Sequence, residues 1–224
     1  MSINLNPQKG FRDLYPEDKA YQDYLFALLQ QLAKTNGFLA YDGPLIEDMN
    51  IYLNKSSEEL IKRQTFQIQT KDEAKNLILR PEMTPSLARM IARKAGELNF
   101  PIKLFNLGLR FRYEAPQKGR EREFYQADFD LLGENSLLAD AEIINTAVNL
   151  FITLGATENA FTLYLNSRSM MENKIAAFGI EKNIIKQLLS IIDRQDKLSP
   201  KEFSQLLADL PLDTQQVEQL LEFL

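Results

Sequence analysis

Five charged and amide side chains on two neighbouring segments of the chain have the chemistry to bind a ligand that is partly anionic and partly cationic. They are Arg110, Arg112, Glu114, Gln126 and Asp130. Guanidinium groups bind phosphate oxygens bidentately, and carboxylates bind an ammonium group or an imidazole ring. A solvated sheet face with paired surface charges is the alternative interpretation of the same residues.

Both segments have the period of two that is typical of β-strands. From residue 104 to 114, one face carries Phe105, Leu107, Leu109, Phe111 and Tyr113, and the other carries Asn106, Gly108, Arg110, Arg112 and Glu114. The return segment alternates in the same way, with Tyr125, Ala127, Phe129 and Leu131 opposite Phe124, Gln126, Asp128 and Asp130. The pattern predicts an antiparallel pair of strands with one polar face.

The link between these strands, residues 115–122, is much longer than the two residues that a tight hairpin needs. It contains Lys118, Arg120 and Arg122, together with one glycine and one proline. Long loops that carry charge are frequently functional. We therefore expect a local basic patch at this end of the hairpin.

Composition excludes several classes of site. The 224 residues include no cysteine, which excludes disulfides and thiolate zinc sites, and no histidine, which excludes a Ser/His/Asp triad and histidine-ligated metals. A net charge of −5 argues against non-specific nucleic-acid binding by the whole surface. No apolar run has the length of a membrane span and no signal peptide is recognisable, so we expect a cytoplasmic protein without a membrane partner.

The remaining pattern predicts a mixed domain followed by helices only. We expect helices over 16–36, 54–62, 86–98 and 138–154, a strand over 38–47 that Pro44 kinks or confines to an edge, a hairpin of 65–69 with 76–79, and a strand over 161–165. From Ser167 onward the pattern is helical, over 170–178, 182–192, 200–207 and 213–223. A domain boundary is therefore predicted near Ser167.

Three motifs resemble those of histidyl-tRNA synthetases, which are class II aminoacyl-tRNA synthetases. FRYE (111–114) followed by REFYQADFD (122–130) resembles motif 2, LRPEMTPSLAR (79–89) resembles the amino-acid-binding signature, and KGFRD (9–13) resembles the N-terminal signature. They occur in the order of the family. Together they span residues 9 to about 167.

This resemblance implies an α+β fold: a class II synthetase-like antiparallel sheet flanked by helices, with a C-terminal all-helical segment. Residues 1–166 would be the N-terminal part of the catalytic core, with motifs 1 and 2. Residues 167–224 would be part of a helical insertion domain. The helix, strand and proline of residues 16–47 resemble motif 1, which implies a homodimer through this region.

The resemblance also implies the reaction. Histidine would attack the α-phosphate of ATP to give histidyl-adenylate, and the histidyl group would pass to tRNA(His). The implied ATP-binding residues are Arg112, which is also the catalytic residue, Glu114, Arg120 and Phe124. The implied histidine-binding residues are Glu82, Thr84, Arg112, Gln126 and Asp130, and the implied contacts with the tRNA acceptor end are Gln117 and Lys118. Mg²⁺ would be bound through the ATP phosphates, and no protein metal site is predicted.

The family's motif 3 and its anticodon-binding domain would follow residue 224. The resemblance therefore implies a part of a longer enzyme, and we expect the chain alone to be nearly inactive. Two alternatives remain open at this point. One is a non-catalytic relative, either a regulatory subunit of ATP phosphoribosyltransferase or a sensor of histidine or tRNA. The other is a different class II synthetase, such as the prolyl or threonyl enzyme, which the pattern of Gln126 and Asp130 disfavours.

Overall fold

The chain folds into two compact units, Met1–Ala160 (unit 1) and Phe161–Leu224 (unit 2). The computed structural model describes residues 3–53, 63–70, 76–195 and 198–223. Each unit has its own hydrophobic core. The boundary lies shortly before Ser167, in the segment that precedes the first helix of unit 2.

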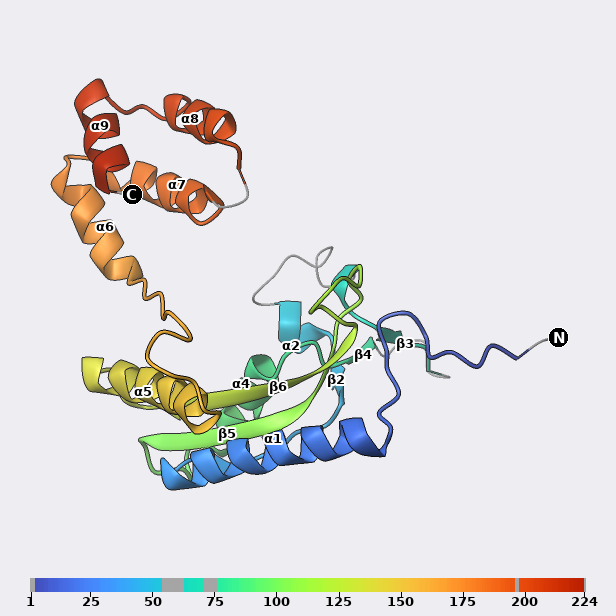
Figure 1. Ribbon diagram of the computed structural model, residues 1–224. Helices are drawn as coiled ribbons and strands as arrows, with labels where there is room; N and C mark the ends of the chain where they lie inside the picture. Colours follow the sequence, from blue (N-terminus) through green and yellow to red (C-terminus); the bar gives the residue numbers. More distant parts are fainter. Residues whose placement is uncertain (1–2, 54–62, 71–75, 196–197, 224) are drawn as a thin grey trace. The chain divides into compact units, whose positions relative to one another are not determined.

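A long antiparallel hairpin forms the centre of unit 1 (Figure 1). Strand β5 (Ile102–Phe111) pairs with β6 (Glu123–Leu132) along its whole length, with Gly108 opposite Gln126. The short strand β1 (Leu39–Ala40) pairs with β5 in parallel on the other side. The predicted antiparallel pair is confirmed.

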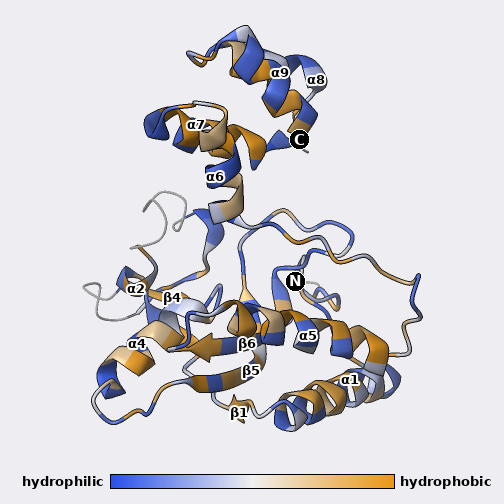
Figure 2. Ribbon diagram, turned by 90° about the vertical axis from the view of Figure 1, so that its left-hand side faces the viewer, coloured by the Kyte–Doolittle hydropathy of each residue, from blue (hydrophilic) through white to orange (hydrophobic). Residues whose placement is uncertain are grey.

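Helices α1 (Pro16–Thr35) and α5 (Leu137–Thr153) are the long helices of unit 1, and both contact this part of the fold. The core beneath them contains Ala33, Phe38 and Phe105. Residues packed against it are Leu29, Leu107, Ala127, Phe129 and Ile143. Because side chains alternate along a strand, the opposite face of β5 and β6 carries the polar residues, which gives both strands the mixed colouring of Figure 2.

A second, antiparallel sheet contains β2 (Ile46–Asp48), β4 (Leu77–Leu79) and β3 (Gln67–Ile68), in that order. The short helix α2 (Asn50–Leu53) packs against α4 (Thr84–Lys94) beside it. The core between α2 and β4 contains Met49, Tyr52 and Ile78. The predicted hairpin of 65–69 with 76–79 is thus confirmed, whereas the predicted helix over 54–62 and the turn at 71–75 lie outside the described residues.

The prediction of one strand over residues 38–47 is wrong, because this segment is shared between the two sheets as β1 and β2. Residues 41–45 between them are irregular. Pro44 has no N–H group to donate to a neighbouring strand. The Gly43 carbonyl and the Asp42 carboxylate accept hydrogen bonds from the Arg80 side chain. At the kink predicted from Pro44, the chain therefore passes from one sheet to the other.

Unit 2 is a bundle of α6 (Arg168–Ala177), α7 (Lys182–Ile192), α8 (Pro200–Ala208) and α9 (Thr214–Phe223). Its core centres on Ile175, Leu188 and Leu220, which are fully buried. Ser199 and Glu202 form a capping box at the start of α8, which explains why this helix begins at Pro200. Among the helices of the described residues, none is both long enough and apolar enough to cross a membrane.

The prediction of a strand over residues 161–165 is wrong. Its alternating pattern is real, but a strand also needs a neighbouring strand that supplies ladder hydrogen bonds. Within the described parts of the chain, neither sheet includes this segment, and Tyr164 is 90% exposed. The segment therefore connects the two units without joining a sheet.

Replacing Leu188 by alanine should destabilise unit 2 strongly, because it leaves a cavity in a fully buried position. The expected loss in the free energy of unfolding is about 2–5 kcal/mol. Urea denaturation monitored by circular dichroism measures it. The matched control is Leu221→Ala on α9, where the side chain is 53% exposed and the loss should be about 1 kcal/mol or less. Equal losses in the two variants would show that the core is misassigned.

Candidate functional site

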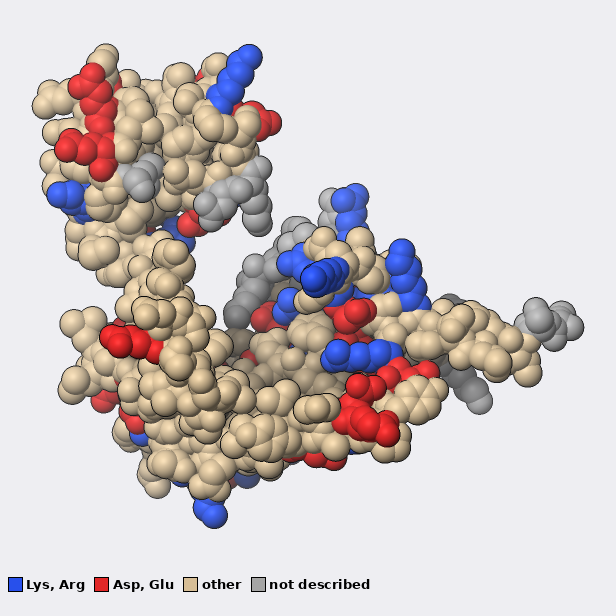
Figure 3. Space-filling model, in the orientation of Figure 1, with Lys and Arg blue, Asp and Glu red and all other residues tan. Residues whose placement is uncertain are grey.

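A pocket of about 310 Å³ lies at the loop end of the β5–β6 hairpin. It is lined by Arg112, Glu114, Gly119, Arg120, Glu121, Phe124 and Tyr125. The structure thus brings together the four residues that the motifs assign to ATP. Figure 3 shows Lys and Arg side chains gathered over this end of the hairpin, with Asp and Glu side chains next to them.

Arg112 follows the end of β5 and connects the pocket to the segment between β4 and α4. Its guanidinium lies 5.2 Å from the centroid of the Phe124 ring, and its Nε donates to the Pro81 carbonyl at 3.1 Å. The backbone N–H of Arg112 also donates to the Arg122 carbonyl at 2.9 Å. These contacts hold the guanidinium at the pocket, where a cation suits a phosphate group.

Glu114 and Arg120 form an ion pair of 3.3 Å across the pocket. Arg120 is 61% exposed, so this pair contributes little to stability. Arg122 fixes the backbone of Glu114 independently of this ion pair. Its guanidinium lies 4.3 Å from the centroid of the Tyr113 ring, and its Nε donates to the Glu114 carbonyl at 3.0 Å. A charged ligand could therefore separate Glu114 from Arg120 at low cost.

The tip of the loop is a tight turn that exposes the two predicted tRNA contacts. Gln117 and Arg120 exchange backbone hydrogen bonds of 3.1 and 2.8 Å, and Gly119 between them has a φ of 77°, in the left-handed region that favours glycine. Gln117 and Lys118 are both exposed. They are therefore accessible to a large partner.

Gln126 and Asp130 lie on the polar face of β6 and are half-buried. The Gln126 side chain donates to the Asp128 carboxylate at 2.6 Å. Asp130 accepts a hydrogen bond from the Tyr41 hydroxyl at 3.2 Å. Both predicted residues therefore have fixed neighbours but are not enclosed.

Glu82 and Thr84 lie at the junction between β4 and α4. The Glu82 carbonyl accepts a hydrogen bond from the Tyr52 hydroxyl at 3.2 Å, and Thr84 is exposed at the first position of α4. The bond from Arg112 to Pro81 brings this junction to the pocket. No hydrogen bond or ion pair among the described residues joins the Glu82 or Thr84 side chain to Gln126 or Asp130, so the structure does not bring these two pairs into direct contact.

The sequence did not predict that the polar face is held by buried arginines. Arg80 and Arg110 are 1% and 0% exposed. Arg80 donates from Nη1 to the Asp42 carboxylate and to the Gly43 carbonyl, each at 2.8 Å, and from Nε to the Leu109 carbonyl at 3.1 Å. Arg80 is part of the LRPEMTPSLAR motif (79–89), which was the available signal, but burial of an arginine cannot be predicted from sequence alone.

Gly108 makes room for these two arginines. A Cβ atom at this position would lie 2.7 Å from Nη2 of Arg80 and 3.1 Å from Nη1 of Arg110. Both distances are shorter than ordinary contacts between a carbon atom and a nitrogen atom. A larger residue here would therefore force a guanidinium group to shift, because of the close approach of two side chains rather than because of the backbone conformation.

The electrostatics of the face disfavour a negative charge on Asp130. Burial, with a further contribution from the Asp128 charge, raises the pKa of Asp130, although the hydrogen bond from Tyr41 opposes the shift. Burial also raises the pKa of Tyr41, and the Asp130 carboxylate adds to this effect, so the hydroxyl remains a donor. A bound cation would stabilise the Asp130 carboxylate.

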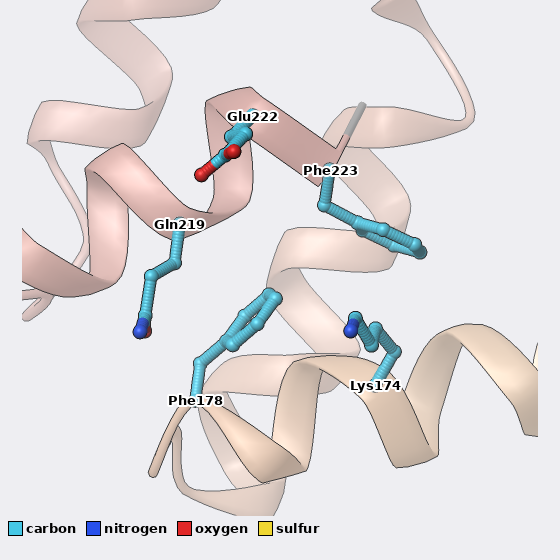
Figure 4. A pocket seen from close by; sticks show the side chains of 5 residues that line it. All are labelled: Lys174, Phe178, Gln219, Glu222 and Phe223. Atoms are coloured by element: carbon cyan, nitrogen blue, oxygen red, sulfur yellow. The ribbon is translucent and has the colours of Figure 1, made fainter.

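A second pocket, of about 400 Å³, lies in unit 2 between α6 and α9 (Figure 4). Its walls include the Phe178 and Phe223 rings, which meet edge to face at a centroid distance of 6.2 Å. The Lys174 ammonium lies 5.7 and 6.0 Å from the two ring centroids. None of the predicted site residues lines this pocket, and its contacts join the two helices.

Asp130→Asn should make the ligand-free chain more stable at neutral pH, because it removes a half-buried carboxylate whose folded-state pKa is raised. The wild-type chain should lose stability as the pH rises from the unfolded pKa through the folded pKa, whereas the variant should not. Below the unfolded pKa the difference should vanish. Thermal melts over a pH series measure this, with the exposed Asp140→Asn as control. A variant that is less stable at neutral pH would contradict the assignment.

Comparison with known proteins identifies the family. The family model of histidyl-tRNA synthetase matches residues 10–224. The histidine–tRNA ligase of Leptospira biflexa is 33% identical over 218 residues, which are 96% of this chain and 50% of that protein. The ligase of Opitutus terrae is 36% identical over 216 residues, which are 96% of this chain and 49% of that protein. The chain therefore spans about half the length of these relatives.

Solved structures have the same fold. The histidyl-tRNA synthetase of Nostoc sp. PCC 7120 superposes with a TM-score of 0.81 at 23% identity, over 99% of this chain and 49% of that one. An ATP phosphoribosyltransferase regulatory subunit/histidyl-tRNA synthetase of Bacillus halodurans gives 0.77 at 20% identity, over 98% and 56%. The predicted α+β fold of a class II synthetase type, with a C-terminal helical segment, is confirmed. The chain belongs to the histidyl-tRNA synthetase family.

Proposed function

We propose that this chain is the ATP- and histidine-binding part of a histidine–tRNA ligase. The observation that carries the proposal is the pocket at the hairpin end, because Arg112, Glu114, Arg120 and Phe124 line it together. Family membership supports the reaction class. Because the chain spans about half the length of its relatives, we expect the 224-residue chain alone to have little ligase activity.

ATP would bind with its base against the Phe124 ring and its phosphates toward the arginines. Arg112 would hold the α-phosphate and Arg120 the γ-phosphate, while Glu114 would accept a hydrogen bond from the exocyclic amine of adenine. The Glu114–Arg120 pair, in which Arg120 is 61% exposed, supports these roles, since ATP would offer each partner a new contact in place of the other. The loop in the present structure would then be its ligand-free arrangement.

Mg²⁺ would be bound by the phosphate oxygens of ATP rather than by the protein. In the described parts of the chain, no group of three or more acidic side chains is arranged to hold a metal ion. The residues around the pocket include Arg112 and Arg120, which suit phosphate oxygens. When bound, the ion would neutralise part of the phosphate charge.

Histidine would bind on the polar face of β6. Gln126 and Asp130 would contact its ammonium group and imidazole ring, and Glu82 and Thr84 would contact the ammonium group from the start of α4. The raised pKa of Asp130 supports this role, because a cationic ligand restores the carboxylate that burial disfavours. Arg112 would bridge the carboxylate of histidine and the α-phosphate.

The chemistry would need positioning and charge stabilisation rather than a protein nucleophile. The carboxylate oxygen of histidine would attack the α-phosphorus, and the bond to the β-phosphate oxygen would break to release pyrophosphate. Negative charge builds on the α-phosphate oxygens during this step, and Arg112 would stabilise it. The histidyl group would then pass to the 3′ end of tRNA(His).

The acceptor end of tRNA(His) would contact the tip of the hairpin loop. Gln117 and Lys118 are exposed there, and Arg120 is close by. With a net charge of −5, the chain as a whole does not attract nucleic acid, so the contact would be local.

A regulatory subunit of ATP phosphoribosyltransferase is the second candidate function. The name of the Bacillus halodurans protein, whose fold is similar at a TM-score of 0.77, favours it. Such a subunit would bind histidine without forming an adenylate. Exchange of labelled pyrophosphate into ATP, tested with a panel of amino acids on the full-length protein, separates the two: exchange that depends on histidine supports the ligase, and histidine binding without exchange supports the regulator.

Arg112→Ala in the full-length protein should reduce ATP–pyrophosphate exchange by about 10²–10³-fold, because it removes a preorganised cation from the reacting phosphate. The matched control is Arg168→Ala, which removes an exposed arginine that pairs with Glu172 on the surface of unit 2. The control should leave the exchange rate unchanged. Exchange that survives Arg112→Ala would refute the role of this residue.

We also propose a homodimer through residues 16–47. Leu39 is 66% exposed on β1, which is an edge strand, and a pocket of about 390 Å³ lies beside it, lined in part by Phe38 and Leu107. The first half of α1 exposes Tyr21 and Tyr24 by 74% and 60%. A second copy of the chain would cover this apolar surface.

Leu39→Glu should therefore convert the dimer to a monomer, because it adds a charge at the centre of the proposed contact. Sedimentation velocity over a concentration series measures the change. The control is Leu137→Glu at the start of α5, where the side chain is 85% exposed, and it should remain dimeric. A wild-type chain that is monomeric at every concentration, or a dimer that tolerates Leu39→Glu, would exclude this interface.

A further inference from the structure

The polar face of the hairpin contains a continuous series of hydrogen bonds that begins at Arg80. Nη1 of Arg80 donates to Oδ1 of Asp42 at 2.8 Å. The same oxygen accepts from Nδ2 of Asn106 at 3.1 Å, and Nδ2 also donates to the Tyr41 carbonyl at 2.7 Å. Asn106 is 1% exposed, so its amide can neither rotate freely nor exchange these partners for water.

The series continues from Asn106 to Gln126. Nη2 of Arg110 donates to Oδ1 of Asn106 at 2.5 Å and to Oδ2 of Asp128 at 2.6 Å. Nε2 of Gln126 then donates to Oδ1 of Asp128 at 2.6 Å. The Arg110 side chain is 0% exposed and that of Asp128 is 15% exposed, so this ion pair is largely shielded from solvent.

The chemical types of these groups determine the orientation of each amide. An arginine side chain only donates, and a carboxylate only accepts. Asn106 must therefore turn its oxygen toward Arg110, and Gln126 must turn its nitrogen toward Asp128. The amide oxygen of Gln126 consequently faces away from Asp128.

Asp130, like Gln126, offers a hydrogen-bond acceptor to a ligand. Its carboxylate accepts from the Tyr41 hydroxyl and has further lone pairs for a ligand. The two residues lie four positions apart on one face of β6, about 13 Å along the strand, with Asp128 between them. Gln126, Asp128 and Asp130 therefore each offer an acceptor, and a ligand that contacts all three is favoured when it carries donors.

We propose that Asp128 is a positioning residue: held by the buried Arg110, it orients the Gln126 amide with its oxygen toward the ligand and so makes the face selective for ligands with N–H donors. This inference rests on the proposed function in taking histidine as that ligand. Histidine has donors on its ammonium group and on its imidazole ring. A ligand that presents an acceptor to Gln126 would meet an oxygen and be rejected.

Asp128→Asn tests the proposal with almost no change of shape. The oxygen of the introduced amide can still accept from Arg110, but its nitrogen then faces Gln126, which must reverse its own amide and turn its nitrogen toward the ligand. The affinity of the 224-residue chain for L-histidine should fall by about 10–100-fold, the effect expected for loss of a hydrogen bond to a charged donor. Isothermal titration calorimetry measures it.

The matched control is Asp209→Asn in unit 2. Asp209 also accepts a hydrogen bond from a glutamine, Gln205, at 3.1 Å, but this pair is exposed. The control should bind histidine with unchanged affinity. Equal affinities of wild type and Asp128→Asn would overturn the proposal.

A ligand-free measurement separates this inference from the proposed function. In NMR spectra of the wild-type chain, the side-chain amide protons of Gln126 should exchange with solvent more slowly than those of Gln205, because Asp128 and Arg110 are shielded. Asp128→Asn should shift the Gln126 side-chain resonances and leave those of Gln205 in place. Equal exchange rates in the wild type would overturn the proposal even if the variant did not fold. If the amide behaves as expected but the wild-type chain binds no histidine, the proposed ligand fails and the orientation of Gln126 stands.

Discussion

The site depends on the hydrogen bonds of the buried Arg80 guanidinium. This group joins the connection between β1 and β2, through Asp42 and the Gly43 carbonyl, to the Leu109 carbonyl of β5. An unpaired charge in this position would be strongly destabilising, so the stability of unit 1 depends on these partners. Arg80 thus sets how the two sheets of unit 1 meet, and the junction that carries Glu82 follows it directly.

The sequence predicted the parts of the fold that local pattern controls. The alternation around Gly108 and Gln126 was sufficient to predict the antiparallel pair and its polar face, because burial of one face requires that period. The helices of unit 2 were predicted for the same reason, and the predicted start at residue 200 is confirmed, with Ser199 as the cap of α8. The residues of the hairpin-end pocket were recognisable as a group because FRYE and the basic loop are close in sequence.

Features that depend on distant partners could not be predicted. The division of residues 38–47 between two sheets follows from the Arg80 contacts, and segment 161–165 has the period of a strand but belongs to neither sheet of the described residues. Tyr41 was not predicted at all, because only the fold brings its hydroxyl to Asp130, 89 positions away. Pairing of Glu114 with Arg120 was likewise unexpected, since the motifs assign each residue to a different part of ATP.

Gly108 couples the side chains that are tolerated at three positions of this protein, 80, 108 and 110. A side chain there would approach both guanidinium groups, that of Arg80 most closely, so at least the Arg80 guanidinium would have to shift before a larger residue could be accommodated. Loss of Arg110 would leave Asp128, which is only 15% exposed, without its cation, whereas Asp42 is 66% exposed and would be solvated after loss of Arg80. The effects of substitutions at positions 80, 108 and 110 on stability are therefore expected to be non-additive.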